Sequence, residues 1–547
     1  MKWGVLLVLV LVVLALALAA CGSSTSSTTS PAASPKAGGT YNYPLQSEPV
    51  AIDPTVTQES EGFEVNHQVF EGLAKYVVQP DGTMKTEPNL AESWDSPDGK
   101  VWTIKIKPGI MFQAPVSREV TAQDFVDDWT YNCDPKNNSI TTYIIAPIVG
   151  VDDSGYLTGK TLTGVKALDK YTLQVTLKYP FFDFPVTLGH PITMPFPLEY
   201  LKQVGAKAWA DKPIGTGPYI VSSWVHNQSI DLVKNTAWWQ AKNGQQSYVD
   251  NIHFKIYAGD PTPEFLDFQK GVIDASYIPP GQVVATQNNT NVKNGTWQFK
   301  LWPNLGLYYT GIYQKSPILG GSAGLPLRQA LAYSADTTAV INVAREGVPL
   351  KASGYIPAGI PGYEKQKLIY PYDPAKAKAL VAQIGTVPTL TYWFNTDPGH
   401  QKVAEALQAG WKAVGINVTL SNYAWAAYLA KLQKDTTRQL WRLGWLADYP
   451  SMDDFVFPLF QSGQSKFNTY TDYSNPTVDS LIQQARGTKD EAQRTNLYIQ
   501  AEQQVQTDLA VLPIYWYRED VVDNASRIGG FYLDPLLAVN MWQVWVK

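Results

Sequence analysis

Short strands and amphipathic helices follow one another along this sequence from Gly39 to its end, with no low-complexity spacer between them. Apolar residues alternate with polar ones in Val101–Lys107, Tyr171–Leu177 and Ile252–Tyr257. This period of two is typical of strands that bury one face. A chain of 547 residues predicts roughly two to four domains. Because no low-complexity spacer is present, these domains are expected to be joined by ordered crossings of the chain rather than by flexible linkers.

Helix signals lie between these strands. Thr121 and Asp124 have the spacing of a capping box at the start of an apolar stripe. Asn475 followed by Pro476 is a second start signal, and Gly415 ends a third apolar stripe as a C-terminal cap. Strands and helices mixed along the whole chain predict an α/β fold class.

The first 21 residues predict the compartment. Lys2 is followed by an uncharged, apolar run from Trp3 to Ala20, and small residues lead directly into Cys21. This pattern resembles the bacterial lipoprotein box, which implies that residues 1–20 are a signal peptide and that Cys21 receives a lipid. An ordinary signal peptide or a simple membrane anchor is the alternative.

Residues 21–39 predict a flexible tether, because Ser, Thr, Ala, Pro and Gly dominate them and no apolar periodicity is present. The protein is therefore expected to work outside the cytoplasm, held at the cell membrane on the cell surface or in a periplasm. The chain has 2 cysteines. If Cys21 is acylated, Cys133 has no disulfide partner and is expected to be a small buried residue.

Composition excludes several functions. The chain has 43 basic and 48 acidic residues and no basic tract, so it lacks the electrostatic footprint of a nucleic-acid-binding protein. Its 5 histidines are scattered without metal-ligand spacing, and no paired C-x-x-C motif is present. We therefore expect no metal site, no cofactor and no nucleic-acid partner.

The sequence contains matches to catalytic motifs, but their flanking residues do not predict the structure that an active site needs. Gly320–Gly324 matches the G-x-S-x-G pattern, but the flanking residues predict a loop rather than the strand and helix that a hydrolase nucleophile needs. The acidic pairs Asp152-Asp153 and Asp453-Asp454 are expected to be solvated, because adjacent carboxylates point apart. The chain is not expected to be an enzyme, and a secreted hydrolase that uses Ser322 or an acidic pair is a remote alternative.

A series of segments spread over almost the whole body shares the order and the residues of one known family. Together they resemble the extracytoplasmic solute-binding proteins of peptide-type ABC importers, the oligopeptide- and dipeptide-binding family. The segments are Val69–Leu73, Leu90–Trp94, Asp98–Ile104, Pro108–Phe112, Thr121–Phe125, Pro213–Tyr219, Arg328–Tyr333 and Leu512–Tyr517.

The resemblance implies a two-lobed clamshell that closes on its ligand by a hinge motion. Lobe one would span residues 40–300, with an inserted accessory subdomain at about 75–190. Lobe two would span 301–510, and 511–547 would return to lobe one. The implied partners are a peptide, an ABC permease with its ATPase, and the membrane through the lipid anchor; we expect a monomer.

The stretch Trp441–Pro450 contains an Arg and an Asp in apolar, aromatic surroundings, where an unpaired charge costs several kcal/mol. A peptide carries the complementary ammonium and carboxylate. The resemblance implies that Asp448 holds the peptide ammonium and that Arg442 meets a carboxylate. Trp445 would form a flat wall for a side chain, and Gly444 would let the peptide backbone approach closely.

Other interpretations of these residues stay open. Asp448 is also suited to cap a helix that begins near Pro450, and Arg442 to pair with an acid of its own lobe. Glu48 is a candidate contact from the first lobe, although a surface carboxylate would have the same sequence context. The 18 tryptophans would also suit an oligosaccharide-binding protein of the same superfamily.

Overall fold

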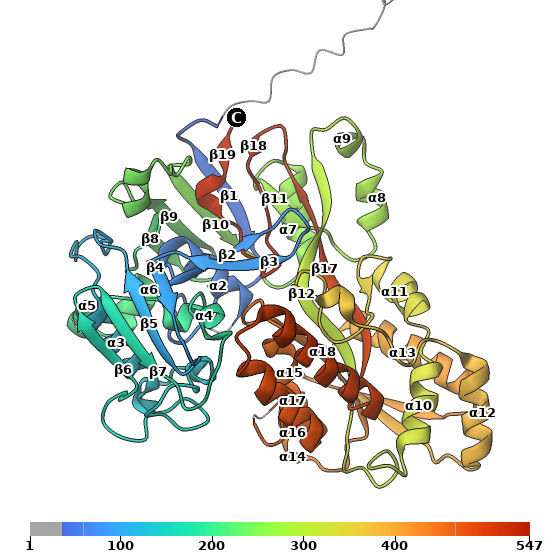
Figure 1. The fold of residues 1–547 in the computed structure, drawn as a ribbon. Coiled ribbons are helices and arrows are strands. Elements are labelled where there is room, and N and C mark those ends of the chain that lie inside the picture. Colours follow the sequence, from blue (N-terminus) through green and yellow to red (C-terminus); the bar gives the residue numbers. More distant parts are fainter. Residues whose placement is uncertain (1–34, 58, 465–466) are drawn as a thin grey trace, which may run out of the picture.

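The computed structural model describes residues 35–57, 59–464 and 467–547. The chain forms two lobes and a smaller accessory subdomain, each built on its own β-sheet (Figure 1). This is the two-lobed α/β architecture that the resemblance implied. The predicted signal peptide, Cys21 and most of the predicted tether lie outside the described residues.

A four-stranded sheet in the order β1-β10-β9-β8 forms the first lobe. β1 and β10 are parallel, and the other neighbouring strands are antiparallel. Ile252 and Phe254 of β10 are buried, as the period-two pattern predicted, and Tyr41 and Tyr43 of β1 are buried with them. The strands are β1 (Thr40–Leu45), β8 (Tyr219–Val225), β9 (Ser229–Lys234) and β10 (Asn251–Ile256).

The accessory subdomain is an antiparallel sheet in the order β4-β5-β7-β6, with helix α3 packed on it. The predicted capping box is present at the start of α3, where the Thr121 N–H donates to Asp124 at 2.7 Å. A hairpin of β2 and β3 precedes this sheet. The elements are β2 (Ala74–Val78), β3 (Met84–Pro88), β4 (Ala91–Asp95), β5 (Val101–Ile106), α3 (Ala122–Cys133), β6 (Val165–Asp169), β7 (Thr172–Thr176), α4 (Phe184–Thr187), α5 (Leu198–Val204) and α6 (Ala206–Asp211).

The second lobe contains a seven-stranded sheet in the order β11-β17-β12-β16-β14-β15, with β13 also paired to β17. Its central strands are buried on both faces by two groups of helices. Tyr392 and Leu440 pack in the core with α10–α13, whereas Trp393 and Trp441 pack in the core with α14–α18. The strands are β11 (Ala275–Tyr277), β12 (Gln298–Ile312), β13 (Leu350–Lys351), β14 (Leu390–Asn395), β15 (Val418–Tyr423), β16 (Leu440–Leu446) and β17 (Val511–Asp523).

The helices of this lobe begin and end largely where the sequence signals lie. Asn475 caps α17 by accepting the Thr477 N–H, and Gly415 follows α13 with a φ of 96°. The helices are α10 (Leu325–Tyr333), α11 (Thr337–Arg345), α12 (Pro374–Ile384), α13 (Pro398–Ala413), α14 (Trp425–Lys434), α15 (Asp453–Phe460), α16 (Asn468–Thr471), α17 (Pro476–Arg486) and α18 (Glu491–Asp508). The remaining elements are α2 (Ser60–Val69), α7 (Pro261–Gln269), α8 (Val283–Gln287), α9 (Thr290–Lys293), β18 (Ile528–Gly529) and β19 (Trp545–Val546).

The two longest strands run as a pair through both lobes (Figure 1). The first part of β12 pairs with the end of β17, next to β11, and its second part pairs with the start of β17, next to β16. The register is interrupted between Pro303 and Leu307. The lobe boundaries predicted near residues 300 and 510 fall on these strands and stay a prediction.

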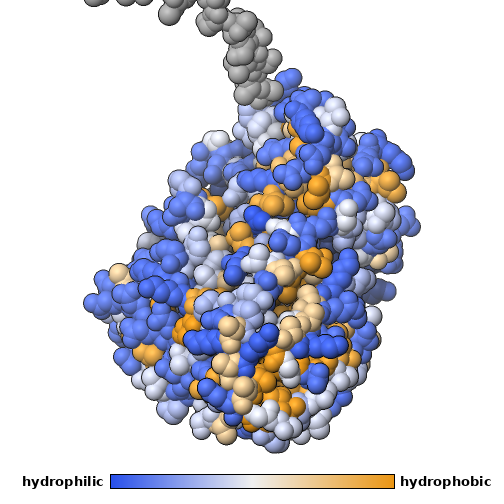
Figure 2. All heavy atoms as spheres, turned by 90° about the vertical axis from the view of Figure 1, so that its right-hand side faces the viewer, coloured by the Kyte–Doolittle hydropathy of each residue, from blue (hydrophilic) through white to orange (hydrophobic). Residues whose placement is uncertain are grey.

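The described residues contain no helix that is both long enough and apolar enough to cross a membrane. Exposed large apolar side chains, such as Val284, Val343 and Trp425, come from separate helices. On the face shown in Figure 2, hydrophobic patches are interspersed with hydrophilic surface.

Asp183 joins the accessory subdomain to the second lobe. This carboxylate is 7% exposed and lies 2.8 Å from Nε of Arg494 on α18. It also accepts hydrogen bonds from Ser451 at 3.3 Å and from Tyr498 at 3.2 Å. This ion pair and its additional donors hold the accessory subdomain and the second lobe together in the arrangement of this structure.

Asp183→Asn is expected to open the ligand-free protein, because it leaves Arg494 without its carboxylate at a cost of about 3 kcal/mol to the closed arrangement. The radius of gyration from small-angle X-ray scattering should increase. Asp81→Asn is the control, since Asp81 accepts hydrogen bonds from Thr83 within its own hairpin. Unchanged scattering for Asp183→Asn would contradict this role.

Candidate functional site

Strand β16 places the predicted site residues on two different faces of the large sheet. Trp445 packs in the core with α14–α18, like Trp441 and Leu443. Arg442 and Gly444 point to the opposite face, where they line a cavity between the lobes. Trp445 is therefore separated by the sheet from Arg442 and Gly444.

Arg442 is buried without a carboxylate partner in the described part of the chain. Its Nη1 donates to Asn395 at 2.9 Å, and its Nη2 donates to the Tyr517 hydroxyl at 3.3 Å. The guanidinium lies 4.7 Å from the centre of the Tyr308 ring, and Nε has no hydrogen-bond partner. The alternative that Arg442 pairs with an acid of its own lobe is wrong in this structure.

Gly444 is explained by Tyr517 on β17, which lies across β12 in the same sheet. A Cβ at this position would lie 2.5 Å from the Tyr517 hydroxyl. An alanine would therefore displace the hydroxyl that holds Arg442. Whether the glycine also lets a peptide backbone approach stays a prediction.

The cavity beside Arg442 and Gly444 has a volume of about 470 Å³ and is called the inter-lobe cavity. Its walls come from both lobes. The first lobe contributes the end of β1 and the start of α2. The large sheet and the helices on it contribute Tyr277 of β11, Asn304, Trp425, the end of β16, and Tyr517 and Glu519 of β17. A concave site with polar groups from both lobes is the usual form of a ligand pocket.

Asp448 follows β16 and contacts the accessory subdomain. Tyr143 of that subdomain donates a short hydrogen bond to the Asp448 carboxylate. The Asp448 N–H in turn donates to Oδ2 of Asp454 at 3.1 Å. Helix α15 begins at Asp453, after Met452, so Asp448 does not cap it and that alternative is wrong.

Asp454 is fully buried next to Asp448, and these two residues are called the acid pair. Oδ2 of Asp454 accepts hydrogen bonds from the Trp445 indole at 3.0 Å and from the Asp448 backbone, whereas its Oδ1 has no partner. No basic nitrogen lies within ion-pair distance of either carboxylate in the described residues. The acid pair thus joins a fully buried and a partly buried carboxylate that lack a cation in the described residues.

Burial has a strong effect on both carboxyls. It raises the pKa of Asp448 to about 6, against the opposing hydrogen bond from Tyr143. Burial and, secondly, the charge of Asp448 raise the pKa of Asp454 well above its usual value. A ligand cation would offset this cost, because an opposite charge favours the ionised form of both groups.

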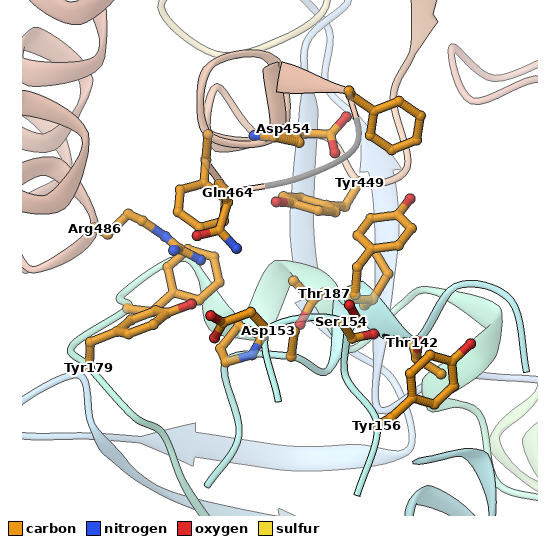
Figure 3. A pocket seen from close by; sticks show the side chains of 18 of the residues that line it. Thr142, Asp153, Ser154, Tyr156, Tyr179, Thr187, Tyr449, Asp454, Gln464 and Arg486 are labelled. Carbon is orange, nitrogen blue, oxygen red and sulfur yellow. Dashed lines mark hydrogen bonds between the residues drawn. The ribbon is translucent and has the colours of Figure 1, made fainter. Parts of the chain in front are cut away.

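A second cavity, of about 250 Å³, lies beside the acid pair, between the accessory subdomain and the second lobe. Figure 3 shows Tyr449, Asp454 and Arg486 of the second lobe facing Thr142, Asp153 and Ser154 of the accessory subdomain. Most of the other lining side chains are aromatic or aliphatic.

The expectation that Asp453-Asp454 is solvated is wrong, because both residues are 0% exposed. The two carboxylates do point apart. Asp453 lies 3.2 Å from Nε of Arg486 and accepts hydrogen bonds from Tyr449 at 2.9 Å and Tyr498 at 3.0 Å. Asp453 and Asp454 are buried because α15 begins inside the contact between the second lobe and the accessory subdomain.

Trp445 is 6% exposed and packs edge-to-face on Phe467 with 4.9 Å between ring centres. Its indole N–H orients Asp454, and its role as a wall for a ligand side chain stays a prediction. Glu48 accepts hydrogen bonds from His226 at 2.7 Å and from the Asn227 N–H at 2.9 Å, at the turn between β8 and β9. The structure thus places Glu48 apart from both cavities.

The sequence expectations for Ser322 and Cys133 are confirmed. Ser322 lies in an exposed turn before α10, in agreement with the loop interpretation of Gly320–Gly324. Cys133 is a free, buried cysteine. The described residues contain no cluster of three or more His, Cys, Asp or Glu residues suited to a metal ion.

Tyr143 and Asp454 are site residues that sequence reasoning missed. Tyr143 lies 305 residues from Asp448 along the chain, and no local pattern indicates that the two meet. Asp454 was recognised as half of an acidic pair, and the apolar residues that follow it in α15 were the available sign of burial.

A family model described as bacterial extracellular solute-binding proteins, family 5 Middle, matches residues 85–467. The chain belongs to this family of solute-binding proteins. It is 30% identical over 498 residues to the periplasmic oligopeptide-binding protein OppA of Escherichia coli, covering 86% of each chain. It is 28% identical to the oligopeptide-binding protein OppA of Bacillus subtilis, covering 90% of each.

The fold of this family 5 protein is also that of solved structures. Haemophilus influenzae OppA in complex with RPPGFSPFR superposes with a TM-score of 0.73 at 23% identity, covering 94% of this chain and 100% of that one. The segment from Arg442 to Asp448 lies within the range that the family model matches.

Asp448→Asn is expected to stabilise the ligand-free protein at pH 7. The pKa of Asp448 is about 6 in the folded chain and about 3.9 in an unfolded one, so its contribution to stability falls as pH rises through this window. The gain should reach at most about 3 kcal/mol above pH 6 and vanish near pH 4. Thermal unfolding from pH 4 to 7 measures it.

Asp81→Asn is the control for this pH dependence, because hydrogen bonds from Thr83 lower the pKa of Asp81 and the sign of its effect is opposite. A stability difference between Asp448→Asn and the native chain that stays constant from pH 4 to 7 would contradict the assignment.

Proposed function

We propose that this protein captures peptides outside the cytoplasmic membrane and delivers them to the permease and ATPase of an ABC importer. The observation that carries the proposal is a set of buried charges of opposite sign without internal ion-pair partners. The acid pair lies at one end of β16, and Arg442 lies on the strand itself. A peptide with free termini carries the two complementary charges.

In this proposal the α-ammonium of the peptide binds Asp448, next to Tyr143 and Asp454, and a carboxylate of the peptide meets Arg442. These contacts use groups that every free peptide possesses, so peptides of many sequences would be accepted. The names and the peptide complex of the relatives described above support a peptide ligand.

Capture would proceed by closure of the lobes around the peptide without covalent chemistry and without a cofactor. Tyr143 belongs to the accessory subdomain and Asp448 to the second lobe, so a ligand bound between them favours the closed state over the open one. The change of shape would then signal to the permease that the protein is loaded.

The proposal places a monomeric protein at the membrane surface, attached by a lipid on Cys21. Residues 21–39 would act as a tether that keeps the body within tens of ångströms of the membrane. A globular body on such a tether remains close to the permease after each release.

Asp448→Asn is expected to weaken the binding of tri- and tetrapeptides with a free amino terminus by about 30- to 100-fold, because a charge-assisted contact worth about 2–3 kcal/mol is lost. N-acetylated versions of the same peptides should lose much less. Isothermal titration calorimetry measures both, and equal losses for the two peptide sets would exclude the ammonium role.

Arg442→Gln tests the other end of the ligand. Peptides with a free carboxylate should bind about 10- to 100-fold more weakly to the variant, whereas peptide amides should be nearly unaffected, since an amide cannot use the charge of Arg442. The same calorimetric titrations apply. Parallel losses for acid and amide would mean that Arg442 acts only through the structure around Tyr517.

A further inference from the structure

The inter-lobe cavity has an uneven distribution of charge. Arg442 is the one basic residue among the described residues that line it, and three carboxylates share the same walls. Glu61 and Glu64 are three residues apart on α2, so both face the cavity from the first lobe, and Glu519 faces it from β17. The lining therefore carries more acidic than basic groups.

Glu64 is 6% exposed and incompletely satisfied. Its Oε1 accepts the Val539 N–H at 3.2 Å, and its Oε2 receives no hydrogen bond from the described residues. Burial raises the pKa of Glu64 well above its usual value. This carboxylate lines the cavity, and no ion pair of Glu64 is present in the described residues.

The two neighbouring carboxylates are held by neutral donors. Glu519 accepts a hydrogen bond from Asn304 at 2.7 Å, and Glu61 accepts one from the Ser47 hydroxyl at 2.7 Å. Tyr277 lies among these acids. Burial is the main reason that the pKa of Tyr277 is raised, and the charges of Glu519, Glu64 and Glu61 are among those that raise it further.

The basic groups of the cavity do not neutralise these acids. The Arg442 guanidinium donates to Asn395 and Tyr517 and forms no ion pair with the three carboxylates. Burial raises the pKa of Glu519, against the hydrogen bond from Asn304 and the charge of Arg345, which does not line the cavity. No metal-binding cluster is present in the described part of the chain, so an organic cation fits this lining best.

We infer that the inter-lobe cavity selects peptides with a lysine or arginine side chain, whose cationic head binds between Glu61, Glu64 and Glu519. This inference rests on the proposed function and names the preferred class of peptide. The rings of Tyr43, Tyr277 and Trp425 line the same cavity and suit the aliphatic stem of such a side chain. The cavity volume of about 470 Å³ accommodates one long side chain.

The test uses tetra-alanine and variants that carry either lysine or its uncharged, similarly shaped analogue norleucine at position 2, 3 or 4. Isothermal titration calorimetry with the full chain gives the ratio of the two dissociation constants at each position. At one position, lysine is expected to bind at least tenfold more tightly than norleucine.

The double variant Glu61→Gln, Glu64→Gln should reduce this ratio towards one, and Glu519→Gln should reduce it partly. Glutamine at position 64 keeps an acceptor for the Val539 N–H, and the thermal midpoint reports whether each variant is folded. The control is Glu92→Gln, Glu364→Gln, which removes two exposed charges outside the cavity and should leave the ratio unchanged.

Equal affinities for lysine and norleucine peptides at every position would overturn the inference while the proposed function stands. A lysine preference that persists in both the double variant and Glu519→Gln would overturn the assignment to this cavity. If neither tetra-alanine nor any substituted peptide binds, the proposed function itself fails.

Discussion

The two-lobed architecture depends on the pairing of β12 with β17. These strands come from distant parts of the chain, and together they contribute to the sheet on both sides of the passage between the lobes. The pairing register is interrupted between Pro303 and Leu307, where Pro303 also lacks a backbone donor. Fewer ladder hydrogen bonds make this the point at which the paired strands bend at the lowest cost. No flexible linker is needed, because the crossing itself is ordered.

Charges at the contacts between lobes are treated in two contrasting ways. Asp183 pairs with Arg494 across the contact between the accessory subdomain and the second lobe, and Asp453 pairs with Arg486 within the second lobe. Asp454 is fully buried and Asp448 is partly buried, and neither has a cation within ion-pair distance in the described residues. Acids without a cation in such surroundings cost stability, and the proposed function gives a reason for retaining them, because a ligand cation would offset that cost.

The position of β16 inside the sheet explains how one short segment serves two cavities. Its side chains alternate between faces, so Trp445 orients Asp454 on the side of the accessory subdomain while Arg442 and Gly444 face the inter-lobe cavity. Each cavity is completed by another part of the chain. Tyr143 reaches the acid pair, and α2 brings Glu61 and Glu64 opposite Arg442. Closure of the lobes therefore assembles both cavities together.

Local sequence determined the elements: the period-two strands, the capping box at Thr121 and the Asn475 cap formed where the pattern predicted them. It also indicated Arg442 and Asp448 as candidate site residues, because charged side chains in an apolar segment are unusual. Tertiary structure alone decided that Asp454 is buried, that Tyr143 meets Asp448, and that Glu48 turns to His226 while Ser47 beside it binds Glu61. The reason is physical: capping and periodicity act over a few residues, whereas the burial and pairing of a charge depend on segments hundreds of residues away.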